Sequence, residues 1–226
     1  MKIAIMQPTF LPWIGYFKLI SEVDTFIFFD DAQYSKSSWH NRNRILVKNH
    51  INWLTLPIKK KSFNTSINNT TIDFTKDWKS MIISKIENAY QNHNFFNDLN
   101  FLKYFIMNFS GNSLGILNIE LIKLISKKID ISSTFKLASS LNIDAKRTDK
   151  IIEICILNQA SEYISPIGAK EYIEEDNNFG KSEINLSFFD YKPKIYDQIN
   201  QKEFISHLSI IDLIANIGLK QLKKYF

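Results

Sequence analysis

The densest group of polar and charged side chains lies in residues 30–44, which read DDAQYSKSSWHNRNR. This stretch holds two carboxylates, two arginines, one lysine, two asparagines and three ring side chains. A buried strand does not need so many polar groups, because each would lose its contacts with water. An arginine guanidinium binds a phosphate or carboxylate at two points, and a lysine acts as a point charge. The segment is therefore predicted to bind an anionic ligand.

Residues 41–44 alternate between asparagine and arginine. In an extended chain Arg42 and Arg44 would share one face and Asn41 and Asn43 the other, because successive side chains point to opposite sides. One face would then hold an anion, and the other would orient a sugar or a base.

Aromatic and amide side chains near the N-terminus would complete such a site. Rings stack on a sugar face or a nucleobase, although isolated aromatic residues also pack in cores. Gln7 lies between the end of a predicted strand and Pro8, and this fixed position favours a ligand contact. The predicted substrate-binding residues are Gln7, Trp13, Tyr16, Gln33, Tyr34, Lys36, Trp39, Asn41, Arg42, Asn43 and Arg44.

Candidates for proton transfer come from both ends of the chain. The four histidines show no spacing typical of a metal site, so no metal site is predicted. His207 precedes the apolar stretch LSIIDLIANIG, where its imidazole could act as a general base near neutral pH; the alternative is a surface or capping residue. Asp30 and Asp31 could accept a proton or, alternatively, form structural ion pairs with Arg42 and Arg44. The predicted catalytic residues are His207, Asp30 and Asp31.

The first thirty residues predict the element order strand, loop, helix and strand. Residues 2–6 form an apolar run, residues 14–23 carry apolar side chains at helical spacing, and residues 25–29 form a second apolar run. This order is typical of a parallel α/β sheet, in which ligands bind beyond the carboxyl ends of the strands. One crevice is therefore expected to be lined by Gln7, Asp30, Asp31, Arg42, Arg44 and His207.

The remainder of the chain predicts more strands and helices around this sheet. Strands are expected at residues 44–47, 53–58, 133–137, 163–165 and 186–191. Helices are expected at residues 78–90, 97–109, 116–128, 148–157 and 210–224. The first three of these helices predict a helical subdomain at about residues 77–130. The fold is thus predicted to be a single domain over residues 1–226, of the α/β class, with a Rossmann-like parallel sheet core and a helical subdomain.

The composition fits a globular chain with a packed core. The 226 residues are 45% hydrophobic and 23% charged, which suits one large domain. The one cysteine, Cys155, lies in an apolar run and is predicted to be a buried structural thiol. No apolar run approaches the roughly 20 residues that span a bilayer, and the N-terminal apolar run is too short for a signal peptide. We therefore expect a cytoplasmic protein without membrane insertion.

The net charge of +5 and the pI near 9.1 raise the question of nucleic-acid binding. Most lysines are spread along predicted helices, and the run at residues 59–61 is expected to be a solvated edge. An anionic small molecule is therefore the expected partner, and nucleic acid is not.

Several long segments, distributed over nearly the whole chain, resemble the sequence pattern of a known protein family. Those in the first quarter are MQPTFLPWIGYFKLI, DTFIFFDDAQYSKSSWHNRNRI and NWLTLPI. The later ones are DWKSMIISKIENAYQNHNFF, EYISPIGAKEYI, YKPKIYDQ and HLSIIDLIANIG. Together they resemble the WbqC-like protein family, named for a gene product of bacterial O-antigen clusters. The resemblance implies a role in the synthesis of surface polysaccharide (including lipopolysaccharide) precursors.

This setting implies a transferase that attaches an acyl or aminoacyl group to a nucleotide-linked amino sugar. The partner would be the nucleotide-linked sugar. No cofactor is assigned with certainty, but an acyl or aminoacyl donor, or a nucleotide with Mg²⁺, would take part. The two arginines and Lys36 would hold the diphosphate, Trp13 or Tyr34 would stack on the base or sugar, and His207 or a carboxylate would accept the amine proton.

Two alternatives and one departure stay open. The loop TFLPWIGYF is similar to the opening of cytidylyltransferase-type nucleotidylyltransferases, which suggests a nucleotide-dependent activating enzyme with Asp30 and Asp31 as Mg²⁺ ligands. The other alternative is a non-catalytic glycan-binding or assembly protein, and a homo-oligomer is left open. The family commonly has Ser-Gly where this chain has Ser165 and Pro166, and a proline supplies no backbone donor there.

Overall fold

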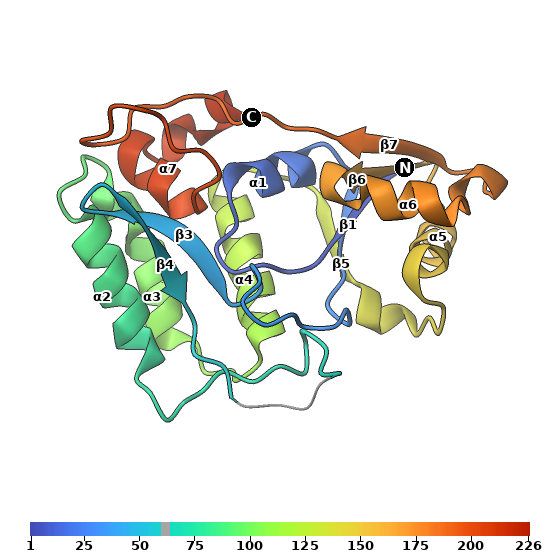
Figure 1. Cartoon of the computed structure of the whole chain (residues 1–226), viewed down its shortest axis with the longest axis horizontal. Coiled ribbons are helices and arrows are strands. Elements are labelled where there is room, and N and C mark those ends of the chain that lie inside the picture. The colour runs from blue at the N-terminus through green and yellow to red at the C-terminus, as the bar shows by residue number, and fades with distance from the viewer. Residues whose placement is uncertain (60–63) are drawn as a thin grey trace.

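In the computed structural model of the chain, which describes residues 1–59 and 64–226, a sheet of five parallel strands forms the centre (Figure 1). The strands are β1 (Lys2–Met6), β2 (Thr25–Phe28), β5 (Thr134–Leu137), β6 (Glu162–Pro166) and β7 (Asn185–Phe189). Their order is β5-β2-β1-β6-β7, so the chain moves outward from β1 and then returns to its other side. The reversal between β1 and β6 is a topological switch point, where sheets of this kind bind ligands. The predicted α/β class with a Rossmann-like core is confirmed.

Alternate residues of the central strands supply two separate hydrophobic cores. Ala4 and Phe26 face one core, whereas Ile3 and Ile27 face the other. This alternation follows from the two-residue period of a strand. Helices cover the first face with α1 (Ile14–Ser21) and α4 (Leu114–Lys128), and the second face with α5 (Arg147–Leu157) and α6 (Lys170–Asp176).

A helical region and a β-hairpin extend the first core. The elements of this region are β3 (Arg42–Val47), β4 (His50–Thr55), α2 (Trp78–Tyr90), η1 (Phe96–Leu99), α3 (Asn100–Asn108) and α7 (Ile210–Ile217). Trp78 and Ile106 belong to the same buried cluster as Ala4 and Phe26, so the helices and the sheet share one core. The helices predicted within residues 77–130 are present, and their description as a subdomain stays a prediction.

The β-hairpin differs from its predicted form. The sequence predicted strands at residues 44–47 and 53–58 with a five-residue connection, but β3 and β4 pair antiparallel around Lys48 and Asn49 alone. Both turn residues have positive φ angles, 48° and 68°, which are the conformations that a tight two-residue hairpin turn needs. Because β3 begins at Arg42, both arginines and Asn43 lie within a regular strand.

The helix predicted at residues 210–224 is wrong in its second half. The helix α7 ends at Ile217, and a 3-10 helix, η5 (Leu219–Tyr225), follows. Gly218 adopts φ 80° and ψ 155°, a backbone conformation found essentially only in glycine. A side chain there would also approach the Phe95 ring to 2.6 Å, so packing as well as backbone geometry ends the helix.

Three further expectations concern local features. Cys155 is buried in α5 as predicted, and burial raises the pKa of its thiol to about 12, which suits a structural residue. No helix in the described ranges is both long enough and apolar enough to cross a membrane. Lys60 and Lys61 of the basic run, and residues 62–63 of the polar stretch, lie outside the described residues.

Candidate functional site

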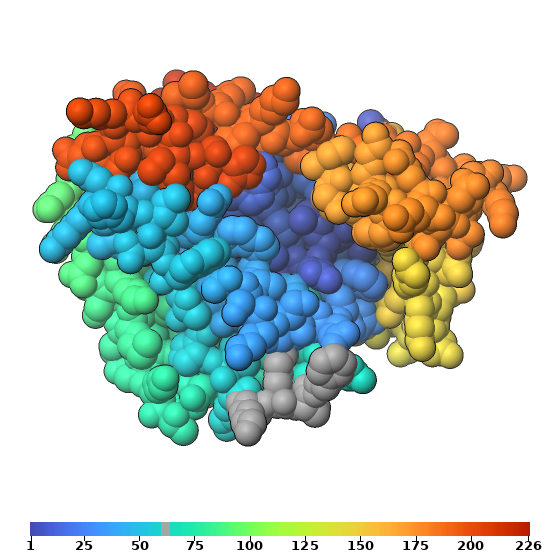
Figure 2. Space-filling view, viewed as in Figure 1, coloured from blue at the N-terminus to red at the C-terminus, as the bar shows by residue number. Residues whose placement is uncertain are grey.

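Two adjoining cavities open at the carboxyl ends of β1 and β6. The large cavity measures about 640 Å³ and is lined by Gln7, Arg147 and Pro166 among others. The small pocket measures about 220 Å³ and is lined by residues that include His207. Both share Met6, Thr9 and Trp39 as walls, so they form one continuous crevice. Figure 2 shows this face hollowed between the N-terminal residues, α6 and the C-terminal segment.

Buried asparagines hold the loop that forms the floor of this crevice. Asn43 Nδ2 donates to the carbonyl oxygens of Phe10, at 3.0 Å, and Leu11, at 2.8 Å. Asn118 Nδ2 donates to the carbonyl oxygen of Pro8 at 3.1 Å. These bonds occupy loop carbonyls that have no strand or helix partner, and buried carbonyls of this kind need donors.

The C-terminal segment holds the same loop from another side. Ser209 Oγ donates to the carbonyl oxygen of Leu11 at 2.7 Å, and the backbone N–H of Ile210 donates to that of Pro12 at 2.9 Å. Leu11 has φ 43°, which costs a residue with a side chain about 1–2 kcal/mol. The hydrogen bonds therefore fix a strained loop, and they attach the last helix to it.

Gln7 and His40 form a pair at the end of β1. His40 is 4% exposed, and its Nδ1 accepts a hydrogen bond from the backbone N–H of Ser35 at 3.3 Å. The imidazole proton is therefore assigned to Nε2, which donates to Gln7 Oε1 at 2.8 Å. This bond orients the Gln7 amide, and its Nε2 has no hydrogen-bond partner among the described residues. A ligand in the large cavity would accept from this group.

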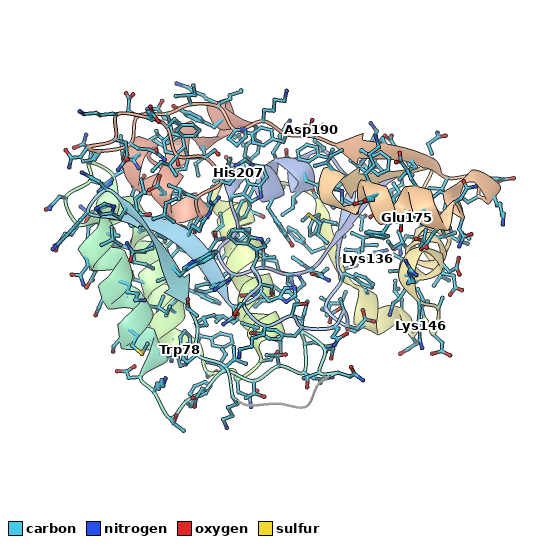
Figure 3. All side chains as sticks on the ribbon, in the orientation of Figure 1. Trp78, Lys136, Lys146, Glu175, Asp190 and His207 are labelled. Atoms are coloured by element: carbon cyan, nitrogen blue, oxygen red, sulfur yellow. The ribbon has the colours of Figure 1, made fainter. Side chains whose placement is uncertain are left out.

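His207 lines the small pocket and lies next to α1 (Figure 3). Its ring is 4.4 Å from the Trp13 ring, centroid to centroid, and its Nδ1 lies 2.8 Å from Ser206 Oγ. Arg44 Nη2 donates to the carbonyl oxygen of His207 at 3.1 Å and to that of Ser206 at 3.3 Å. His207 has φ 58°, so these contacts hold its backbone in an uncommon conformation.

The electrostatic surroundings favour neutral His207. Partial burial is the main cause that lowers its pKa below the ordinary value of 6.5, and the positive charge of Arg44 lowers it further. The imidazole is therefore uncharged at neutral pH. Nε2 has no partner in the parts of the chain that the structure describes, so it is available to accept a proton.

Asp30 and Asp31 lie outside the linings of both cavities, in contrast to their predicted placement. Asp30 is 3% exposed, and its carboxylate accepts from the Ser139 N–H at 3.0 Å and the Ser139 Oγ at 2.6 Å. Asp31 forms an ion pair with Lys150 at 2.6 Å. Both carboxylates thus join β2 to segments beyond β5. Among the described residues no group of three histidine, cysteine or acidic side chains is placed to hold a metal ion.

Arg42 and Arg44 also lie outside the linings, and each guanidinium lies near a tryptophan ring. The Arg42 guanidinium lies 4.0 Å above the Trp53 ring and donates to the carbonyl oxygen of Ser37. The Arg44 guanidinium lies 5.6 Å from the Trp39 ring. The alternative that these arginines pair with Asp30 and Asp31 is wrong for the described structure, since Asp30 is bonded to Ser139 and Asp31 to Lys150.

The other predicted ligand contacts divide into three groups. Trp13, Tyr16, Trp39 and Asn43 line the small pocket, although the Asn43 amide is already bonded to the loop. Asn41 and Tyr34 are buried and bonded to each other at 3.0 Å, so they belong to the interior. Gln33 and Lys36 are exposed and lie outside both linings.

The sequence of the chain matches known proteins over most of its length. A profile of the WbqC-like protein family matches residues 7–224, which includes almost every element described above. The chain belongs to the WbqC-like family. A protein of Mycobacterium tuberculosis, named uncharacterized protein Rv1507c, is 33% identical over 220 residues, which cover 96% of this chain and 94% of that protein. No solved structure matches the chain.

Arg147 is the residue of this WbqC-like protein that the sequence argument missed. It starts α5, lines the large cavity and has φ 53°. Its side chain is 69% exposed and forms an ion pair with Asp176 at 3.3 Å. The rule that pointed to Gln7, namely that ligands lie beyond strand ends, applies equally to the connection from the predicted strand at residues 133–137 to the next helix. It points to that connection but does not single out Arg147 within it.

Pro166 lies in the lining of the large cavity, at the carboxyl end of β6. The position where the family resemblance implies glycine therefore lines the large cavity. Because proline has no backbone N–H, this wall offers one donor fewer than a glycine would.

Substitution of Asn43 tests whether its bonds hold the loop. Asn43→Ala leaves the buried Phe10 carbonyl without a donor and removes one of the two donors to the Leu11 carbonyl, so the free energy of unfolding should fall by about 1–3 kcal/mol in urea titrations. Asn52→Ala, which removes an exposed amide bonded only to its own hairpin, should change stability by less than about 0.5 kcal/mol. Equal small losses in both variants would show that the loop does not depend on Asn43.

Substitution of Arg44 tests the electrostatic link to His207. In Arg44→Gln the pKa of His207, followed by NMR titration of its imidazole C–H signals, should rise. It should stay below 6.5, because burial is the larger cause of the shift. Arg42→Gln is the matched control and should leave this pKa unchanged, since Arg42 is not among the causes of the shift. An unchanged pKa in Arg44→Gln would contradict the link.

Proposed function

We propose that this WbqC-like protein is a transferase that joins an acyl or aminoacyl group to the amine of a nucleotide-linked amino sugar. The two-part crevice at the switch point carries this proposal. A large cavity with a free amide donor and a cation adjoins a small pocket with an uncharged histidine. The two parts suit an acceptor and the group that it receives.

The large cavity supports binding of the nucleotide-linked sugar. Its volume of about 640 Å³ lies within the roughly 300–1,000 Å³ of typical ligand sites. Gln7 presents two amide hydrogens to a sugar hydroxyl or a phosphate oxygen, and Arg147 presents a planar guanidinium that suits a diphosphate. The rings of Tyr163 and Tyr172 add walls on which a base or sugar can pack.

The small pocket supports the transfer step. The amine nitrogen of the sugar attacks the carbonyl carbon of an activated acyl donor, and a C–N bond forms while the bond from that carbon to the leaving group breaks. His207 Nε2 takes the proton that the amine loses and returns it to the leaving group. The products are the amide and the protonated leaving group, so the reaction balances without a redox partner. An uncharged imidazole at neutral pH suits this role.

The activating-enzyme alternative draws less support from the geometry. It needs Asp30 and Asp31 as oxygen ligands for Mg²⁺. The oxygens of Asp30 accept from the Ser139 N–H and Oγ and from Asn68 Nδ2, and Asp31 Oδ2 is paired with Lys150. Asp31 Oδ1 has no hydrogen-bond partner among the described residues, but a metal ion held by both carboxylates would compete with the bonds of the other oxygens.

Binding of a nucleoside diphosphate tests the proposed role of the large cavity. Arg147→Gln should weaken the binding of UDP or dTDP, measured by calorimetry, by about 1–2 kcal/mol, which is a factor of about 5–30. Arg42→Lys keeps its charge on the hairpin and should leave affinity unchanged. If Arg42→Lys weakened binding and Arg147→Gln did not, the diphosphate would be bound by the hairpin arginines that the sequence favoured. If neither nucleotide bound the wild-type protein, the proposal would be refuted.

Turnover tests the role of His207. With a nucleotide-linked amino sugar and an activated acyl donor, His207→Gln should lower the rate by roughly 10²–10⁴-fold, the usual contribution of a general base, while nucleotide affinity stays the same. In the wild type the rate should fall as the pH drops through a pKa below 6.5, because the base must be unprotonated. Mass spectrometry of the sugar product measures the rate. Nucleotide binding without any acylated product would favour a non-catalytic glycan-binding protein.

A further inference from the structure

Two polar side chains of the small pocket, Asn43 and Tyr16, already use their polar atoms in bonds within the protein. Asn43 gives its amide hydrogens to Phe10 and Leu11, and its Oδ1 accepts from the Arg44 N–H at 2.8 Å. Tyr16 is 2% exposed, and its hydroxyl donates to the carbonyl oxygen of Gln7 at 3.1 Å. What these residues offer to a ligand is therefore ring and backbone surface.

Most of the remaining walls are apolar, and Thr9 adds one hydroxyl group. Met6, Pro12, Trp13 and Trp39 contribute thioether, ring and aromatic surface. The lining includes no aspartate, glutamate, lysine or arginine, so a charged group that entered the pocket would have no opposite charge there. Burial of an unpaired ion is strongly unfavourable. The lining contains two titratable groups, the imidazole of His207 and the phenol of Tyr16.

We propose that the small pocket is a subsite for an uncharged, short acyl chain, which it holds against Trp13 with the carbonyl group towards His207. At about 30 Å³ for each water-sized group, its volume of about 220 Å³ accepts about seven such groups. This inference rests on the proposed transferase function and narrows it. The transferred group is a simple acyl chain, because the ammonium ion of an aminoacyl group finds no carboxylate in the lining and is repelled by Arg44, whose guanidinium lies 5.6 Å from the Trp39 ring.

A substitution at Gly15 would change the shape of this pocket without replacing any residue that lines it. A Cβ atom at Gly15 would lie 2.3–2.7 Å from three atoms at the far end of the Trp13 ring. Gly15→Ala must therefore move that ring, whose other neighbours are His207 and Tyr191. Alanine is also the better helix former within α1, so the fold should tolerate the change.

The indole N–H signals of the four tryptophans provide the measurement. Trp13 borders the small pocket, Trp39 borders both cavities, and Trp78 is a buried reference. Butyramide, an uncharged probe with six non-hydrogen atoms, should shift the Trp13 and Trp39 signals in a saturable manner at millimolar concentrations. Butylammonium and butyrate, which are similar in size but charged, should not.

Two glycine variants make the test specific. Gly15→Ala should weaken butyramide binding about tenfold or more, the scale of a blocked methylene site, and should leave UDP affinity unchanged. Gly180→Ala, where an added methyl meets one atom at 3.8 Å, is the matched control and should bind butyramide as the wild type does. If the charged probes shift Trp13 as strongly as butyramide, or if Gly15→Ala has no effect, the inference is overturned.

A titration with UDP distinguishes failure of the acyl subsite from failure of the proposed nucleotide site. If UDP fails to shift Trp39 while butyramide shifts Trp13, the acyl subsite stands and the nucleotide-binding proposal fails. If UDP shifts Trp39 and butyramide shifts neither tryptophan, the nucleotide site stands and the acyl subsite is refuted.

Discussion

The crevice depends on hydrogen bonds from side-chain donors to the backbone carbonyls of residues 8–12. This loop follows the central strand β1 at the carboxyl edge of the sheet and pairs with none of the described strands. Asn43 comes from the hairpin, Asn118 from α4 and Ser209 from the start of α7. Because buried carbonyls without donors are costly, one short loop draws three distant parts of the chain together.

The same constraint places the candidate base. The bonds from Ser209 and Ile210 to the loop fix the start of α7, and His207 lies only two residues before Ser209. Arg44 then binds the His207 carbonyl from β3 and lowers the pKa of its imidazole. The hairpin therefore acts on the site through the backbone and through charge. This role differs from direct contact with an anion, which the arginine-rich sequence had suggested.

Several residues whose chemistry would suit a ligand site lie outside the crevice because their polar groups bind other parts of the protein. Residues 30–44 supply many donors and acceptors, and the fold uses most of them internally. Asp30 accepts a hydrogen bond from the Ser139 hydroxyl, Asn41 accepts one from the Tyr34 hydroxyl, and the Arg42 guanidinium packs on the Trp53 ring. Among the described residues, the crevice groups without a hydrogen-bond partner include Gln7 Nε2 and His207 Nε2.

The sequence by itself determined the α/β class, the strand–loop–helix opening and the position of the crevice at strand ends. These follow from local periodicity and from the rule that parallel strands present their carboxyl ends at one edge. Long similar segments also indicated the WbqC-like family. Only the tertiary structure decided which polar side chains are spent on internal bonds, that Gly218 ends the last helix, and that Arg147 joins the site. Those outcomes depend on contacts between residues far apart in the chain, and the residue types of a single segment do not specify its distant partners.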